Sequence, residues 1–179
     1  MNKRLGALAA IAVAVAAFAL APASAFASSA TRTYMLELEA PNTAQAPNGD
    51  SLSITGEGQF SVDPKSVEAE GSFTHTDSEG NVLATGTWTA TQLLTYQSYG
   101  CGVVFGNPIP PELCGGRVMM RVLLTPDGTT LQIPAILSVY CVIGDKRPSS
   151  AEEGVRLVVP GHINFNDVTG GENVYIQTS

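Results

Sequence analysis

The feature that most constrains this chain is a long alternation between apolar and polar residues. From Leu52 to Val62, even-numbered positions hold an apolar residue or glycine and odd-numbered positions hold a polar residue. The apolar positions are odd-numbered from Val67 to Thr76 and mainly even-numbered from Val82 to Leu94. A period of two is typical of strands that bury one face. Turn residues at 63–66 and 77–80 separate the three segments, so we predict an antiparallel meander.

The rest of the chain repeats this pattern in shorter pieces. No segment has the 3.6-residue periodicity of an amphipathic helix of useful length. We therefore predict an all-β fold, a small antiparallel β-barrel or strongly coiled sheet of about 8–10 strands, with a two-sheet β-sandwich as the alternative. Further strands are expected at 32–39, 117–124, 131–143, 154–159, 162–167 and 173–177, with a mobile connection at 40–50.

Glycines occupy the predicted inner face of all three meander strands. If both turns contain four residues, Gly58 lies opposite Gly71, and Gly71 lies opposite Gly86. Matched glycines allow a sheet to bend sharply, and neighbouring aromatic side chains can then cover the gap. The alternative is a hollow under the sheet that admits an apolar ligand. Both interpretations require strong curvature, which favours the barrel. The neighbouring aromatic residues are Phe60, Phe73 and Trp88.

Residues 1–27 have the pattern of an export signal. A short basic start precedes an apolar run at 5–21 and two small-residue cleavage sites, at 23–25 and 25–27. We predict a signal peptide at 1–27, an N-terminal strand and connection at 28–50, and the rest of a single all-β domain at 51–179. An uncleaved membrane anchor is the alternative, but the run is short for a bilayer and no basic cluster follows it. The predicted location is secreted, either extracellular or periplasmic, with no membrane association after cleavage.

Charge excludes one class of partner. Lys3 and Arg4 lie in the export segment, which leaves seven basic residues against 16 acidic residues, a formal charge of −9. Nucleic-acid binding requires a basic surface that neutralises phosphates, so we expect no nucleic-acid partner.

Three cysteines in an oxidising compartment allow one disulfide and one free thiol. Residues 102–113 contain three prolines and two glycines and are not expected to form a ladder, so a disulfide between Cys101 and Cys114 would order an irregular loop. Cys141 lies in an apolar strand and is predicted to be a buried thiol. The rival pairing joins Cys114 to Cys141, which face one another if the hairpin around 125–130 has a four-residue turn.

Metal and catalytic motifs are weak. His75 and His162 are the two histidines, and the chain lacks the closely spaced ligand pairs typical of zinc sites. A calcium site in the glycine-rich turn near the C-terminus is the alternative to an ordinary hairpin turn, which the spacing favours. We therefore assign no metal, no cofactor and no catalytic residue. The oxygen ligands considered for calcium are Asn164, Asn166, Asp167 and Glu172.

We predict a secreted non-enzymatic β-domain that binds a small apolar ligand or an extracellular macromolecule through the barrel mouth and the loop at 99–116. One alternative is an enzyme that uses the barrel interior, with His75 as general acid or base near Trp88 and Tyr96. Another is a structural or surface-interaction domain without a pocket. Fold class does not choose among these three. The candidate ligand-contact residues are Gly58, Gly71, Gly86, Phe60, Phe73, His75, Trp88 and Phe105.

Overall fold

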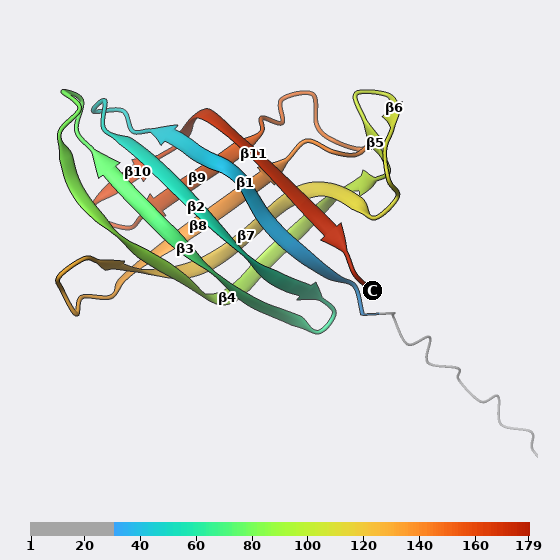
Figure 1. Cartoon of the computed structure of the whole chain (residues 1–179), viewed down its shortest axis with the longest axis horizontal. Helices are drawn as coiled ribbons and strands as arrows, with labels where there is room; N and C mark the ends of the chain where they lie inside the picture. Colours follow the sequence, from blue (N-terminus) through green and yellow to red (C-terminus); the bar gives the residue numbers. More distant parts are fainter. Residues whose placement is uncertain (1–30) are drawn as a thin grey trace, which may run out of the picture.

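The structure is a computed structural model that describes residues 31–179, and the predicted signal peptide at 1–27 lies outside this range. The described chain is all-β and contains no helix, so it also has no helix long and apolar enough to span a membrane. Figure 1 shows its strands in chain order. They are β1 (Thr33–Gln45), β2 (Ser51–Val62), β3 (Lys65–Thr76), β4 (Val82–Cys101), β5 (Val103–Val104), β6 (Asn107–Pro108), β7 (Leu113–Pro126), β8 (Ile133–Cys141), β9 (Gly154–Val159), β10 (Ile163–Phe165) and β11 (Asp167–Gln177).

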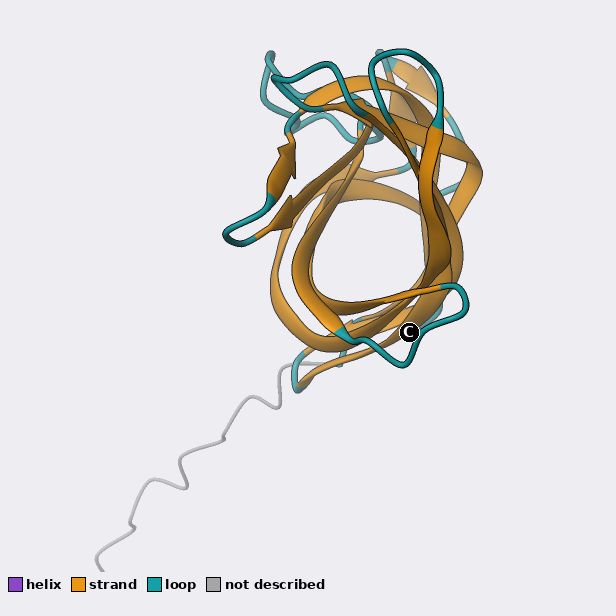
Figure 2. Cartoon of the chain, turned by 90° about the vertical axis from the view of Figure 1, so that its left-hand side faces the viewer, coloured by secondary structure: helices purple, strands orange, loops and turns teal. Residues whose placement is uncertain are grey.

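Six strands form a closed antiparallel ring, as the barrel prediction requires. The order is β7-β11-β1-β2-β3-β4, and β4 pairs again with β7 to complete the ring. Strands β8, β9 and β10 continue the sheet from β7. In end view the strands enclose a ring with connecting loops at its rim (Figure 2). The fold is therefore a small barrel with a three-stranded extension, and closure removes most free sheet edges.

The predicted meander is β2, β3 and β4, and its inner face is the one that the alternation indicates. Leu52, Ile54 and Phe60 on β2 and Phe73 on β3 are buried, whereas Glu57 is exposed. The predicted register is wrong by two residues at each hairpin. Because a shift of two preserves which face each side chain points to, the inner face survives the error.

Turn geometry explains the register error. Val62 pairs with Lys65, so only Asp63 and Pro64 connect β2 to β3. At the next hairpin Thr76 pairs with Val82, so the turn has five residues, and a bulge then adds one more residue to β4, so that His75 pairs with Ala84. The row of Gly58, Gly71 and Gly86 therefore does not form: the observed partners are Ala69, Gly56, Trp88 and Phe73.

A different pair of glycines meets the indole ring of Trp88. Gly56 pairs with Gly71, which pairs with Trp88 on its other side. A Cβ atom on Gly56 would overlap Trp88 Cζ2, and one on Gly71 would lie 2.6 Å from Trp88 Nε1. Trp88 is fully buried and donates a hydrogen bond from Nε1 to the Thr55 carbonyl oxygen over 2.8 Å. The indole thus covers the glycine positions, as in the first interpretation, and fills the space that the alternative treated as a hollow.

The disulfide joins Cys101 and Cys114, which face each other across β4 and β7. Cys141 is a buried free thiol in β8, as predicted. The rival pairing with Cys141 fails because the β7–β8 turn is longer than expected, so that Cys141 pairs with Gly116. The enclosed segment was expected to be irregular, but β5 and β6 form a small ladder within it.

Strand β1 also differs from expectation. It continues past Glu39 to Gln45, where the sequence suggested a mobile connection. Register shifts between Leu38 and Asn42 carry the strand past Pro41, which cannot donate a ladder hydrogen bond. The longer strand brings the β1–β2 turn, and with it Asp50, to one end of the barrel.

Candidate functional site

An apolar pocket of about 230 Å³ opens at one end of the barrel. This end carries the β1–β2, β3–β4 and β9–β10 turns, at the left of Figure 1. The pocket walls are aliphatic and aromatic, and the only ionisable side chains that line it are the histidines at 75 and 162. The lining residues are Leu52, Phe73, His75, Ala84, Leu124, Pro126, Ile133, Leu157, Val159, His162, Ile163 and Phe165.

One wall is the hairpin formed by β9 and β10. Within the described chain, β10 has β9 as its only ladder partner, and β9 joins the sheet through β8. The wall therefore meets the ends of β2, β3 and β4 through side chains alone. Phe165 is buried, and its ring packs edge-on against His75 with 5.2 Å between the centroids. This leaves a pocket between two parts of the sheet that no backbone ladder connects.

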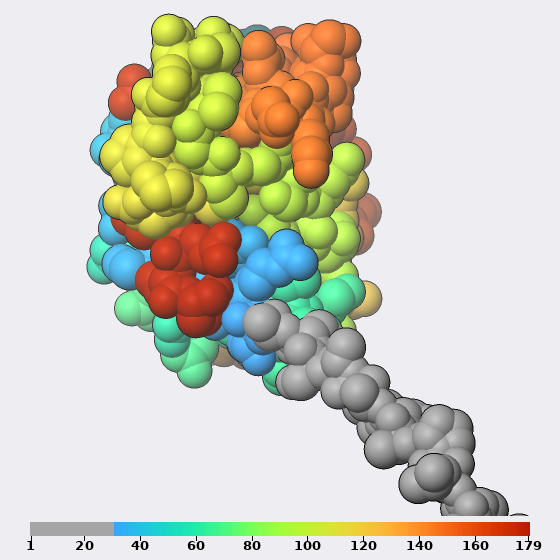
Figure 3. All heavy atoms as spheres, turned by 90° about the vertical axis from the view of Figure 1, so that its right-hand side faces the viewer, coloured from blue at the N-terminus to red at the C-terminus, as the bar shows by residue number. Residues whose placement is uncertain are grey.

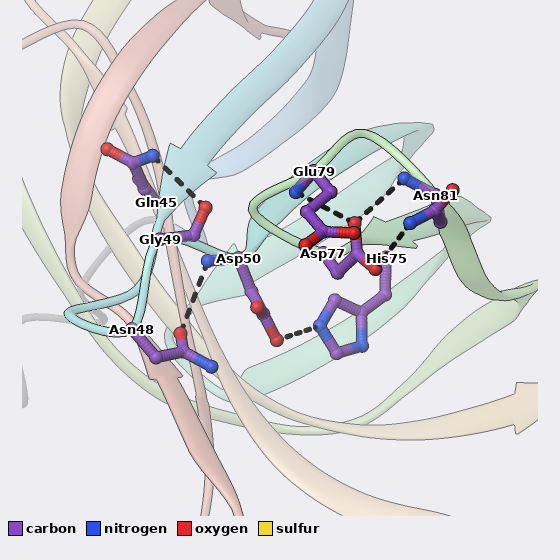
Figure 4. A network of polar contacts seen from close by, with 8 residues as sticks. All are labelled: Gln45, Asn48, Gly49, Asp50, His75, Asp77, Glu79 and Asn81. Atoms are coloured by element: carbon purple, nitrogen blue, oxygen red, sulfur yellow. Dashed lines mark hydrogen bonds and ion pairs between the residues drawn. The ribbon is translucent and has the colours of Figure 1, made fainter.

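The polar group of the pocket is a histidine paired with a carboxylate. His75 Nε2 lies 2.9 Å from Asp50 Oδ2, and only 23% of the histidine side chain and 13% of the aspartate side chain is exposed. His75 comes from β3 and Asp50 from the β1–β2 turn (Figure 4). A carboxylate in this position fixes the orientation of the imidazole ring, as it does in catalytic and ligand-binding histidines.

Two hydrogen-bonded turns flank this pair. In the first, Asn48 Oδ1 accepts a hydrogen bond from the Asp50 backbone N–H, and Gln45 Nε2 donates to the Gly49 carbonyl oxygen. In the second, Asp77 accepts hydrogen bonds from the side chain and backbone of Asn81 and from the backbone of Glu79, which lowers the pKa of the Asp77 carboxyl group. Figure 4 shows both turns beside the pair.

Only two of the ligand-contact residues predicted from sequence line the pocket, namely Phe73 and His75. Gly86 lies next to it, since a Cβ there would be 2.9 Å from Phe73 Cε1. The others lie elsewhere. Phe60 belongs to a buried aromatic cluster with Tyr34, Tyr96 and Tyr175, and Trp88 fills the space at Gly71; Gly58 faces Ala69.

Phe105 lies at the opposite end of the barrel, on the tip between β5 and β6 (Figure 1). Its side chain is 66% exposed, and the Arg147 guanidinium stacks over its ring with 4.7 Å between the guanidinium carbon and the ring centroid. In Figure 3 the disulfide-bound segment and the segment around Arg147 project side by side at this end. The apolar pocket and the 99–116 loop therefore lie at opposite ends of the barrel.

Asp50 and most of the pocket wall were missed by sequence reasoning. The four-residue turn assumed after β2 placed Ile54 rather than Leu52 opposite His75, which moved Asp50 away from the histidine. A two-residue connection at Asp63–Pro64 would have corrected this. No local sequence pattern indicated that residues of β9 and β10 line the pocket, because these strands reach it through tertiary packing.

The chemistry available at this site is limited. The pocket lining contains no serine, threonine or cysteine, so nothing there could serve as a hydroxyl or thiol nucleophile. Over residues 31–179, no three histidine, cysteine, aspartate or glutamate side chains are grouped closely enough to hold a metal ion. What remains is an apolar cavity with one oriented imidazole, which can accept, donate or transfer a proton at a bound molecule.

The chain was compared with protein families, curated proteins and solved structures, and none of them matches it.

Proposed function

We propose that this protein is exported and binds a small apolar molecule in the pocket at the barrel mouth, without transforming it. The observation that carries the proposal is the pocket itself. Its wall is almost entirely apolar, and its volume of about 230 Å³ exceeds the roughly 150 Å³ at which an apolar protein cavity accepts benzene. Known ligand sites combine an apolar wall with a few placed polar groups in the same way.

Three exposed apolar side chains lie close in sequence to residues that line the pocket. Val82 and Leu83 precede the lining residue Ala84, and Leu131 lies two residues before the lining residue Ile133. These three side chains are between 56% and 61% exposed. Exposed apolar side chains beside a cavity are a common feature of ligand entrances.

Titration with toluene, followed by NMR of the side-chain methyl groups, tests this proposal. We expect shifts and intermolecular NOEs at Leu52, Leu157 and Ile163. Ala84→Leu places a larger side chain in the pocket and should abolish them. Ala90→Leu is the matched control, because Ala90 is a partly buried alanine on the same strand that does not line this pocket. Absence of shifts in the wild-type protein, or equal loss in both variants, would overturn the proposal.

Export is the second part of the proposal. The disulfide between Cys101 and Cys114 supports a non-reducing environment, where such bonds persist. Mass spectrometry of the protein recovered from a secreting host gives the test. We expect a mature chain that begins at Phe26 or Ser28, and recovery of the full-length chain in the membrane fraction would contradict it.

An enzyme remains the second candidate, because the Asp50–His75 pair is a suitable general acid or base. Such an enzyme would move a proton on a bound substrate or activate water, since the lining provides no hydroxyl or thiol nucleophile. Turnover of a pocket-bound compound that disappears in His75→Gln would favour this candidate over simple binding.

A further inference from the structure

The pairing between Asp50 and His75 determines which hydrogen-bonding group the pocket presents. An aspartate carboxylate can only accept hydrogen bonds. Because Asp50 Oδ2 lies 2.9 Å from His75 Nε2, the proton of the neutral ring is on Nε2. The remaining nitrogen, Nδ1, is then an acceptor with a free lone pair.

Nδ1 makes no hydrogen bond of its own within residues 31–179. Figure 4 shows it at the edge of the ring turned away from the Asp50 carboxylate. The ring lines the apolar pocket, and three-quarters of the side chain is shielded from solvent. A ligand that supplies an O–H donor to this atom would satisfy an acceptor that is largely shielded from solvent, whereas the second histidine of the lining, His162, is exposed.

The rest of the pocket restricts the body of such a ligand. A volume of about 230 Å³ is sufficient for one six-membered ring with small substituents, and Phe73 and Phe165 provide aromatic walls. A carboxylate head group is disfavoured, because Asp50 already places a negative charge beside the imidazole and the neutral ring offers Nδ1 as an acceptor.

From this geometry we propose that the ligand is a small single-ring phenol, bound with its ring in the apolar pocket and its hydroxyl group donating to His75 Nδ1. The inference rests on the proposed function, since it names the ligand class of the same pocket. Asp50 acts as a positioning residue that keeps the histidine in the accepting tautomer, and it does not touch the ligand.

Calorimetric titrations at pH 8 with p-cresol, toluene and 4-methylbenzoate test the proposal, because these probes differ mainly in their head group. A hydrogen bond of ordinary strength should make p-cresol bind about 2- to 12-fold tighter than toluene. His75→Phe removes the acceptor and keeps an aromatic ring, so the preference should vanish. His162→Phe, at the other histidine that lines the pocket, should keep it.

The ¹⁵N chemical shift of Nδ1 in the wild-type protein gives a readout that does not depend on variants. It should move on addition of p-cresol and stay constant on addition of toluene. Equal affinities for p-cresol and toluene, tightest binding of 4-methylbenzoate, or loss of the preference in His162→Phe would overturn the inference and leave the pocket as an apolar site. If neither toluene nor p-cresol binds, the proposed function fails as well.

Discussion

Trp88 explains why positions 56 and 71 are occupied by glycine. The indole lies on the inner face of the barrel, in the space that side chains on Gly56 and Gly71 would need. It contributes a large buried apolar area, and its N–H group is satisfied by the Thr55 carbonyl oxygen. The missing side chains thus serve a packing role, and the ligand pocket lies elsewhere.

Gly71→Ala should therefore be strongly destabilising. The new Cβ atom would overlap the Thr55 backbone oxygen and crowd Trp88 Nε1, and backbone on a paired strand cannot move away cheaply. We expect a loss of about 3 kcal/mol in the free energy of unfolding, measured by urea denaturation. Gly170→Ala is the control, because its Cβ would meet only Thr43 Oγ1, at 3.1 Å. Similar stabilities for the two variants would refute the packing argument.

Glu153 is a second residue whose environment has a measurable consequence. Its carboxylate accepts hydrogen bonds from the backbone N–H groups of Val142 and Asn173, over 2.7 Å and 2.8 Å. Burial outweighs these bonds and raises the pKa of the Glu153 carboxyl group from 4.5 to about 7. The folded protein therefore binds this proton more tightly than the unfolded chain does.

The stability that Glu153 contributes should be complete below pH 4.5 and be lost as the pH rises to about 7. We expect the unfolding free energy of the wild-type protein to fall relative to that of Glu153→Gln across this window. Denaturation of both proteins at several pH values between 4.5 and 8 gives the comparison. A difference that does not change with pH would contradict the prediction, and an NMR titration of the Glu153 carboxyl carbon would give its pKa directly.

At the scale of elements, cross-strand pairs on the outer face place like charges together. Glu57 on β2 lies opposite Glu37 on β1 and opposite Glu70 on β3. Carboxylates directly opposite one another in an antiparallel sheet repel and cost stability. The repulsion is weakened because Glu57 and Glu70 are exposed and Glu37 is only half-buried, so that water and salt screen the charges.

Glu57→Lys should relieve this repulsion and add two attractive pairs. We expect an increase of up to about 1 kcal/mol in the free energy of unfolding, largest at low ionic strength. Glu79→Lys, at an exposed position in the β3–β4 turn, changes the net charge equally and is the control. If the two variants are equally stabilised, the effect comes from net charge and not from the cross-strand row.

At the scale of the whole molecule, the barrel closes by two different means. Backbone pairing joins β7 to β11 at only two positions, Cys114 with Tyr175 and Leu113 with Ile176. Beyond them, side chains connect β11 to β8 and β9. Tyr175 donates its hydroxyl hydrogen to the Val139 carbonyl oxygen, and the Asn173 amide donates to the carbonyl oxygens of Tyr140 and Gly154.

Asn173 also exchanges hydrogen bonds of 2.9 Å and 3.0 Å with Asn42, and both residues are buried. Asn173→Ala would leave the Asn42 amide and two carbonyl oxygens without these partners inside the protein. We expect a loss of about 2 to 4 kcal/mol and faster amide hydrogen exchange along β11 and β9. Asn164→Ala is the control: Asn164 is exposed, so this substitution should change neither the unfolding free energy nor the exchange rates appreciably. An unchanged rate of amide hydrogen exchange in β11 would show that the contact of β11 with β8 and β9 does not depend on the Asn173 side chain.

Much of the fold could be predicted from short stretches of sequence, because a strand that buries one face alternates apolar and polar residues with a period of two. The strand class and the inner faces of β2 to β4 follow from residue type and spacing. The same reasoning favoured the Cys101–Cys114 disulfide and a buried Cys141, but it left the pairing of Cys114 with Cys141 open. The register could not be predicted, since it depends on turn length and bulges at Asp63–Pro64 and near Leu83. Phe73 and His75 were predicted as ligand-contact residues and do line the pocket. The contact of Asp50 with His75 could not be predicted, because it depends on the β2–β3 register.

The amino-acid sequence by itself determined that this chain forms antiparallel strands and which side of each strand faces inward, because these properties depend on neighbours one or two positions away. Tertiary structure decided that β9 and β10 lie against the ends of β2 and β3, that Trp88 fills the space over Gly56 and Gly71, and that Asp50 meets His75. The last two outcomes depend on the hairpin register, which is set by turn length and a bulge rather than by the alternation. The position of β9 and β10 depends on packing between strands distant in the chain, which no local pattern of side chains encodes.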